Sequence, residues 1–145
     1  MLRIREATVD DATMLADLVT QLGYPSQPED ITRRLRALPP ERNCVLVAVV
    51  DGTVVGWVHV STHCMLQVDE AAQVNGLVVG RRQRGQGTGR ALMEAAEAWA
   101  KERDCTMMYV RSNAQRHDAH AFYRHRGYQQ AKISLTFWKA LRKEP

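Results

Sequence analysis

Hydrophobic and polar positions along the chain follow two different periods, and the changes of period mark the predicted elements. Residues 2–7 alternate charged and apolar side chains, which is typical of a strand. A helix with apolar residues at helical spacing follows; Asp10 or Asp11 can cap its start, and Gly23 stands where it stops. A second amphipathic helix is predicted from about Glu29 to Leu38, where two prolines end it.

Two runs rich in β-branched residues come next, Cys44–Val50 and Thr53–Val60. Only Asp51-Gly52 separates them, and this dipeptide between apolar runs is a strong hairpin signal because both turn residues need positive φ. Both runs are apolar on both faces. We therefore expect two central strands with layers above and below them.

The remaining pattern completes a mixed sheet covered by helices. The further elements predicted are a strand at Gln73–Val79, a helix at Ala91–Ala100, a strand at Thr106–Val110, a short helix at Ala119–His125 and a final strand at Ile133–Trp138. The order β-α-α-β-β-β-α-β-α-β predicts an α/β (mixed α+β) fold. With 145 residues, the chain has the length of one domain, which we expect to span residues 1–145.

Composition narrows the class of protein. A hydrophobic fraction of 45% excludes a wholly disordered chain, and no apolar run approaches the roughly 20 residues that a membrane span requires. The alternating N-terminus does not resemble a signal peptide. Cys44, Cys64 and Cys105 are odd in number and form no CxxC pair, which favours buried free thiols of a cytoplasmic protein over a disulfide framework or a metal site.

The net charge of +4 conceals a division between the halves. Residues 1–70 hold 6 Lys and Arg against 10 Asp and Glu, giving −4, whereas residues 71–145 hold 14 against 6, giving +8. This division is either scatter over two surfaces or a basic half that binds an anion beside an acidic half that tolerates a cation.

A glycine- and arginine-rich loop joins the strand ending at Val79 to the next helix. Gly85, Gly87 and Gly89 alternate with other residues, so the backbone can turn tightly with its N–H groups open to an anion at the helix start. The segment lacks the Gly-Lys-Ser/Thr of a Walker loop. It also fails the dinucleotide fingerprint, because a larger residue stands where the third glycine or alanine is needed.

Two motifs carry a family resemblance. The run Arg84-Gly85-Gln86-Gly87-Thr88-Gly89 matches the Arg/Gln-x-x-Gly-x-Gly/Ala signature of the GNAT N-acetyltransferase superfamily. The run Ala119-His120-Ala121-Phe122-Tyr123-Arg124-His125-Arg126-Gly127-Tyr128 is similar to its second signature, Ala-x-x-Phe/Leu-Tyr-x-x-x-Gly-Phe/Tyr. The chain thus resembles a small single-domain GNAT enzyme of bacterial type, with a mostly antiparallel sheet between helices.

This resemblance implies acetyl-CoA as co-substrate and no metal. The pyrophosphate would rest on the loop, whose implied binding residues are Arg84, Gly85, Gln86, Gly87, Thr88, Gly89 and Arg90. The pantetheine arm would pair with Leu77, Val78 and Val79, where a β-bulge splays this strand from the next one. Asn113 is expected to bind the pantetheine amide. Arg116 stands where many relatives carry Asn, and could reach a phosphate.

The resemblance also implies the catalytic groups. Tyr123 occupies the position of a tyrosine near the thioester sulfur, where its hydroxyl can protonate the departing thiolate. The backbone N–H of Val79 is expected to hold the developing oxyanion. Many relatives carry a Glu base where this chain has Asn75, and Gln73 on the same face is also uncharged. Alternatives for the base are a chain of water molecules or one of four side chains, Asp69, Glu70, His59 and His63.

The acceptor is less visible in the sequence. The expected reaction is transfer of an acetyl group to a primary amine of a small molecule or protein, and the acidic N-terminal half favours a cationic amine. The family places the acceptor near Tyr24, Glu29-Asp30 and Phe137 of this chain, and homodimers are common in it. The alternative is a non-catalytic acyl-CoA-binding sensor on the same fold. A nucleic-acid binder is disfavoured because the basic run is short and broken by glycines.

Overall fold

The computed structural model describes residues 1–112 and 116–142 of the chain. The chain divides into two compact units, Met1–Arg111 and Ser112–Pro145, and each is described by itself. One domain over residues 1–145 therefore stays a prediction.

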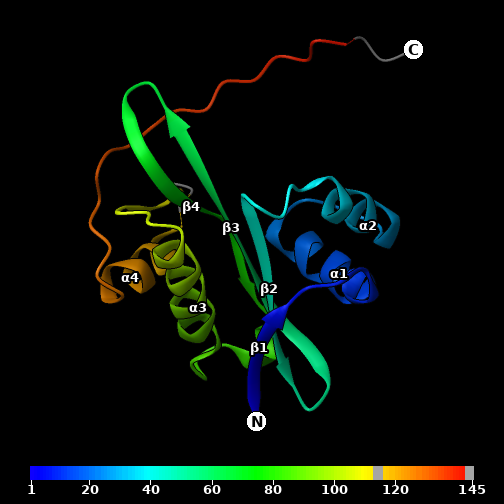
Figure 1. Cartoon of the computed structure of the whole chain (residues 1–145). Coiled ribbons are helices and arrows are strands. Elements are labelled where there is room, and N and C mark those ends of the chain that lie inside the picture. The colour runs from blue at the N-terminus through cyan, green and yellow to red at the C-terminus, as the bar shows by residue number, and fades with distance from the viewer. Residues whose placement is uncertain (113–115, 143–145) are drawn as a thin grey trace. The chain divides into compact units, whose positions relative to one another are not determined.

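The first unit is built on a five-stranded sheet in the order β1-β2-β3-β4-β5 (Figure 1). Its strands are β1 Leu2–Glu6, β2 Asn43–Val50, β3 Thr53–Met65, β4 Val68–Val79 and β5 Met108–Val110. The first four are antiparallel neighbours, and β5 lies parallel to β4. The predicted mixed, mostly antiparallel sheet is confirmed, with β2 and β3 inside it as their apolar faces indicate.

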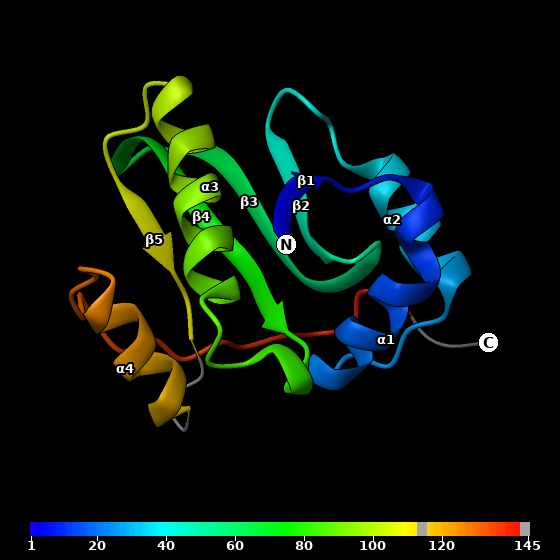
Figure 2. The same ribbon diagram turned by 90° about the horizontal axis from the view of Figure 1, so that it is seen from below.

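Three helices of this unit cover the sheet: α1 Ala12–Leu22, α2 Pro28–Ala37 and α3 Thr88–Glu102. Figure 2 shows α1 and α2 on one side of the sheet and α3 on the other. Leu15, Leu18 and Ile31 of the helix pair join Val47 and Trp57 of the sheet in a buried cluster, so the odd-numbered residues of this part of β2 face α1 and α2. Burial of this apolar surface supplies the main stabilisation of the unit.

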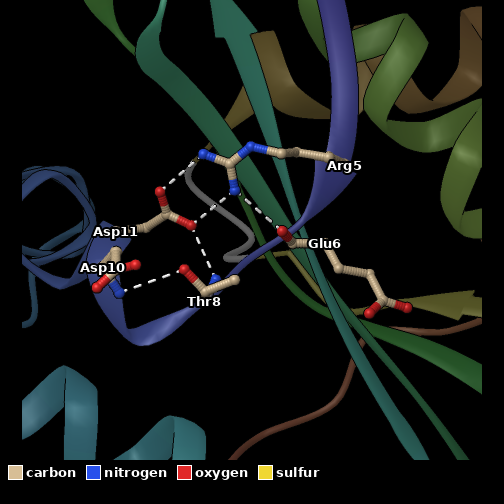
Figure 3. A network of polar contacts seen from close by, with 5 residues as sticks. All are labelled: Arg5, Glu6, Thr8, Asp10 and Asp11. Carbon is tan, nitrogen blue, oxygen red and sulfur yellow. Dashed lines mark hydrogen bonds and ion pairs between the residues drawn. The ribbon is translucent and has the colours of Figure 1, made fainter.

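An ion pair fastens β1 to the start of α1 (Figure 3). Both terminal nitrogens of Arg5 donate to the Asp11 carboxylate at 2.9 Å, and Asp11 also accepts from the N–H of Thr8 at 2.8 Å. Asp11 occupies the N-cap position of α1, as predicted, but makes no side-chain cap there. Its carboxylate turns back because the Arg5 charge and the Thr8 N–H of the preceding turn satisfy it instead.

The predicted hairpin between β2 and β3 is confirmed. Asp51 and Gly52 have φ of 49° and 78°, which is the paired positive φ that this turn needs. Beyond the turn the register shifts between Ala48 and Val49, so Val55 has no partner on β2. Every later residue of β3 is therefore paired with a residue of β2 that lies one position nearer the turn than the turn alone would dictate.

Three strand predictions of the first unit need correction. β3 ends at Met65 and not at Val60. β4 begins at Val68 and not at Gln73, because the polar residues at its start continue the hairpin ladder with the end of β3. β5 is limited to Met108–Val110, since only these residues of the predicted strand pair with β4.

The second unit contains α4, His117–His125, which begins two residues before the predicted start. Gly127, with φ of 93°, follows its end. The predicted final strand Ile133–Trp138 is wrong: these residues form no strand, and Phe137 is 86% exposed. Their alternation fits a strand, but a strand requires a hydrogen-bonded partner, and the described part of this unit holds no other strand.

Candidate functional site

The loop after β4 turns through two glycines that no other residue type replaces without strain. A short 3₁₀ turn, η2 Arg81–Gln83, leads to Gly85 and Gly87, with φ of 79° and 81°. A Cβ added at either glycine would meet nothing within 4 Å. Packing therefore does not explain these glycines; positive φ does, and the space beside the loop is open to a ligand.

The start of α3 presents unpaired backbone donors. Gly87 is the N-cap and has no side chain to cap the helix, and the first N–H of the ladder is that of Ala91, which donates to the Gly87 carbonyl at 3.0 Å. The N–H groups of Thr88, Gly89 and Arg90 precede this bond and have no helical acceptor. Together with the positive end of a 15-residue helix they form an anion site.

The arginines of the loop are held in different ways. Arg84 donates from Nε to the Val79 carbonyl at 3.2 Å, which leaves its terminal nitrogens without a partner among the described residues. Arg90 pairs with Glu94 one turn along α3, with Nε 2.9 Å from the carboxylate. Of the two, Arg84 has more of its charge available to a phosphate.

One edge of β4 is open beside the loop. β5 pairs with β4 only from Ala72 to Val74. No described strand pairs with this edge of β4 between Val74 and its end at Val79. The Gly80 N–H donates to the Val55 carbonyl at 2.7 Å, so by alternation the backbone groups of Leu77 and Val79 turn away from β3 toward the open edge. The side chain of Val78 is buried in the core, and its backbone groups face β3.

A β-bulge lies where β4 leaves β5. The register shifts between His59 and Val60, which pair with Gly76 and Val74 and leave Asn75 without a partner on β3. The bulge that the resemblance implies is present. The Asn75 side chain is engaged on both sides: Oδ1 accepts from Gln73 at 2.9 Å and Nδ2 donates to Ser61 Oγ at 2.8 Å. This row of amides and a hydroxyl contains no group that takes up a proton near neutral pH.

Tyr123 lies in the second unit, on α4, between two aromatic neighbours. Its ring makes edge contacts with Phe122 and Tyr128, at centroid distances of 5.4 and 6.1 Å. Burial raises the pKa of the Tyr123 phenol, and the charge of Arg116 partly opposes this shift. The hydroxyl therefore keeps its proton at neutral pH, as a proton donor requires. Arg116 is the exposed N-cap of α4, and the predicted Asn113 lies outside the described residues.

The four candidate bases differ in their surroundings. His59 Nε2 lies 2.9 Å from Asn43 Oδ1, and burial lowers the pKa of His59. Glu70 accepts a hydrogen bond from the Cys64 thiol, which is the first cause of a lowered pKa for Glu70. His63 lies near the far end of β3, opposite Ala71, and Asp69 is exposed beyond it.

Asn43 and Ser61 were not singled out by the sequence. Asn43 is visible in it only as a polar residue opening an apolar strand, and Ser61 only as a small polar residue at the end of another. Both become relevant through the strand register, which pairs them across β2 and β3.

The three cysteines are free, but only Cys44 is buried as predicted: Cys105 is half-buried, and the prediction is wrong for the exposed Cys64. Cys64 is exposed because it lies near the hairpin end, past the last paired residue of β2. Burial raises the pKa of the Cys44 thiol to about 11, so this thiol stays protonated and is a poor nucleophile. Within residues 1–112 and 116–142 no three His, Cys, Asp or Glu side chains gather to hold a metal, and no helix is long and apolar enough to span a bilayer.

Comparison with known proteins gives the same assignment as the two motifs. Residues 11–128 match the family model described as acetyltransferase (GNAT) family. The chain is 29% identical over 140 residues to the aminoglycoside N(6')-acetyltransferase type 1 of Stenotrophomonas maltophilia, covering 92% of this chain and 90% of that protein. It is also 29% identical over 141 residues to the aminoalkylphosphonate N-acetyltransferase of Salmonella typhimurium, covering 92% and 88%.

A solved structure shares the fold over nearly all of the chain. The crystal structure of a transcriptional regulator from Bacillus halodurans C-125 superposes with a TM-score of 0.84 at 25% identity, covering 96% of this chain and all of that one. The family model spans well over half of the sequence, and the sheet, bulge and loop have the arrangement that its signatures imply. The chain belongs to the GNAT acetyltransferase family.

Proposed function

We propose that this protein is an acetyl-CoA-dependent N-acetyltransferase whose acceptor is the primary amine of a small molecule. One observation carries the proposal: the strand with the open edge at Leu77 and Val79 is joined by a single short loop, residues 80–87, to the uncapped start of α3. An elongated ligand fits this arrangement: an amide-bearing arm would pair with the backbone groups of the β4 edge, and a phosphate-bearing end would accept from the N–H groups at the start of α3.

The residues present fit acetyl-CoA in both parts. The free N–H groups of Thr88, Gly89 and Arg90, with Arg84 beside them, would bind the pyrophosphate, since no side chain fills the space at Gly85 and Gly87. Leu77 would hydrogen-bond a pantetheine amide along the β4 edge, and the N–H of Val79 would remain for the thioester end of the arm. We carry over Val78, Gln86, Asn113 and Arg116 from the family motif as further contacts.

When bound, acetyl-CoA supplies a thioester carbonyl that is open to attack by an amine. The N–H of Val79 points to the open edge and can donate to the oxygen on which charge develops. Tyr123 remains protonated because burial raises its pKa, so it can give a proton to the leaving sulfur. These roles follow from the chemistry of the groups within each unit.

The names of the relatives favour a small-molecule acceptor. One is described as acting on aminoglycosides and the other on aminoalkylphosphonates, both of which are compounds with an amino group. The proposal therefore ranks a small amine above a protein amine. The second candidate, an acyl-CoA sensor, has one observation in its favour: the neutral Asn75 at the position where many relatives carry a glutamate.

The test is product formation from acetyl-CoA and a panel containing an aminoglycoside, an aminoalkylphosphonate and a polyamine. Mass spectrometry should follow the N-acetyl product, because the exposed Cys64 thiol would react with reagents that detect released CoA. An acetylated amine supports the enzyme. Binding of acetyl-CoA without any product supports the sensor.

A further inference from the structure

Asn43 fixes the position of the hydrogen on His59. Asn43 Nδ2 donates to the Pro39 carbonyl at 3.0 Å, and because a carbonyl only accepts, the amide nitrogen must face Pro39. Asn43 Oδ1 therefore faces His59 Nε2 at 2.9 Å, and this oxygen can only accept. His59 must carry its hydrogen on Nε2, so in the neutral ring Nδ1 holds the lone pair.

The surroundings of His59 keep its ring neutral. Its neighbours across the sheet are Val45 on β2 and Gly76 on β4, and burial alone accounts for the lowered pKa of His59. The charged or titratable groups on the same face include Arg3 and Arg5 of β1 and His63 of β3, and Asp11 holds Arg5. None of these contributes to the shift, and no described residue hydrogen-bonds to Nδ1.

His59 lies on β3 opposite the bulged part of β4, on the side of β4 away from its open edge. Gly76, opposite His59, follows the bulged Asn75 and precedes Val79 by three residues, which is about 10 Å along a strand. Because His59 pairs with Val45, it shares the face of Val47 and Trp57, on which α1 and α2 pack. A lone pair at this place is near the bulge and next to the row of amides that cannot take a proton.

We propose that His59 is the general base of the acetyl transfer and that Asn43 is its positioning residue; this inference rests on the proposed function. The acceptor ammonium loses one proton to His59 Nδ1, directly or through one water. The freed nitrogen forms the amide bond as the carbon–sulfur bond breaks and the electron pair leaves with sulfur. The second proton lost by nitrogen balances the one that sulfur gains, and His59 returns its proton to solvent.

The other candidates fit the role less well. His63 is four residues further along β3, about 13 Å from His59 and away from Val79. The Glu70 carboxylate is bound by the Cys64 thiol, and lies beyond His63 in the ladder. Asp69 is still nearer the end of the hairpin.

The test is the dependence of kcat/KM on pH from 5 to 10, with an amine that the wild type acetylates. A base that accepts the ammonium proton makes kcat/KM rise to a plateau above the pKa of His59, with an inflection below about 6.5. In His59→Gln we expect kcat/KM at pH 7 to fall about 100-fold. The plateau should be replaced by a tenfold rise per pH unit toward the amine pKa, as only free amine then reacts.

Two further measurements keep the test independent of one substitution. Asn43→Asp places a carboxylate against Nε2–H, which should raise the pKa of His59 and move the inflection to higher pH. An NMR titration of His59 in the wild type should give the same pKa as the kinetic inflection. His63→Gln is the matched control, and it should keep the wild-type profile.

The outcomes separate this inference from the proposed function. Wild-type turnover with the same pH profile in His59→Gln would overturn the inference alone, as would loss of the inflection in His63→Gln. No turnover of any amine by the wild type would overturn the proposed function and the inference with it.

Discussion

Arg84 donates from Nε to the carbonyl of Val79 at 3.2 Å, which ties the loop to the last residue of β4. The bond occupies the carbonyl of Val79 and leaves its N–H at the open edge. The terminal guanidinium nitrogens of Arg84, in the loop that leads to α3, have no partner among the described residues. One side chain thus links the part of the site that would hold the thioester to the part that would hold phosphate.

Arg84→Ala should weaken acetyl-CoA binding by about tenfold, because a charge-assisted hydrogen bond to phosphate is lost. Affinity should also depend less on salt in this variant, and calorimetry at two ionic strengths measures both effects. Arg81→Ala removes the same charge from an exposed position on η2 and serves as the control. Equal weakening in both variants would indicate a general charge effect and contradict the assignment.

Two glycine variants separate backbone conformation from ligand access. Gly87→Ala forces a side chain into φ of 81°, at a cost of about 1 kcal/mol in the free energy of unfolding, and should reduce binding. Gly89 lies inside α3 without positive φ, so Gly89→Leu should leave the fold stable while its side chain obstructs the N–H groups. Unchanged acetyl-CoA affinity in both variants would remove the loop from the site.

Tyr123→Phe should lower kcat by roughly 10- to 1000-fold with little change in acetyl-CoA affinity, because its hydroxyl acts only when charge builds on sulfur. The phenol keeps its proton at neutral pH, since burial raises its pKa. Steady-state kinetics and calorimetry on the same preparation separate the two quantities. A wild-type rate would reduce Tyr123 to a packing residue of α4.

The ion pair between Arg5 and Asp11 should stabilise the fold in a pH-dependent way. Asp11→Ala should cost about 2 kcal/mol in the free energy of unfolding, because charged hydrogen bonds to Arg5 and Thr8 are lost. The hydrogen bond from Arg5 lowers the pKa of Asp11, so its contribution is present above the unfolded pKa of about 3.9 and is lost as pH falls through the folded pKa. Urea unfolding at pH 7 and pH 3 measures this: the difference between wild type and variant should shrink at pH 3, and a constant difference would contradict the account.

Local signals in the sequence were sufficient for most elements. The Asp51-Gly52 turn placed the β2–β3 hairpin correctly because its geometry depends on two residues alone. The predicted loop lies between a strand and a helix, with Gly85 and Gly87 at positive φ, whereas the third glycine, Gly89, lies inside α3, which begins three residues before its predicted start. These features need no information from distant parts of the chain.

Features that depend on pairing could not be predicted in this way. Counting from the turn would place His59 opposite Cys44, on the face that packs against α3. The register shift at Val55 instead places His59 opposite Val45, and so on the other face. Residues 133–138 likewise alternate as a strand does, but the pattern does not name a partner, and the structure gives them none.

The central claim is that the chain transfers an acetyl group from acetyl-CoA to a small primary amine. The most direct measurement is mass spectrometry of an amine panel incubated with acetyl-CoA and the wild type, with Tyr123→Phe as a parallel sample. We expect at least one amine to gain about 42 Da, the mass added when an acetyl group replaces one hydrogen. This gain should be far slower with the variant. Tight binding of acetyl-CoA with no acetylated amine in any sample would contradict the claim.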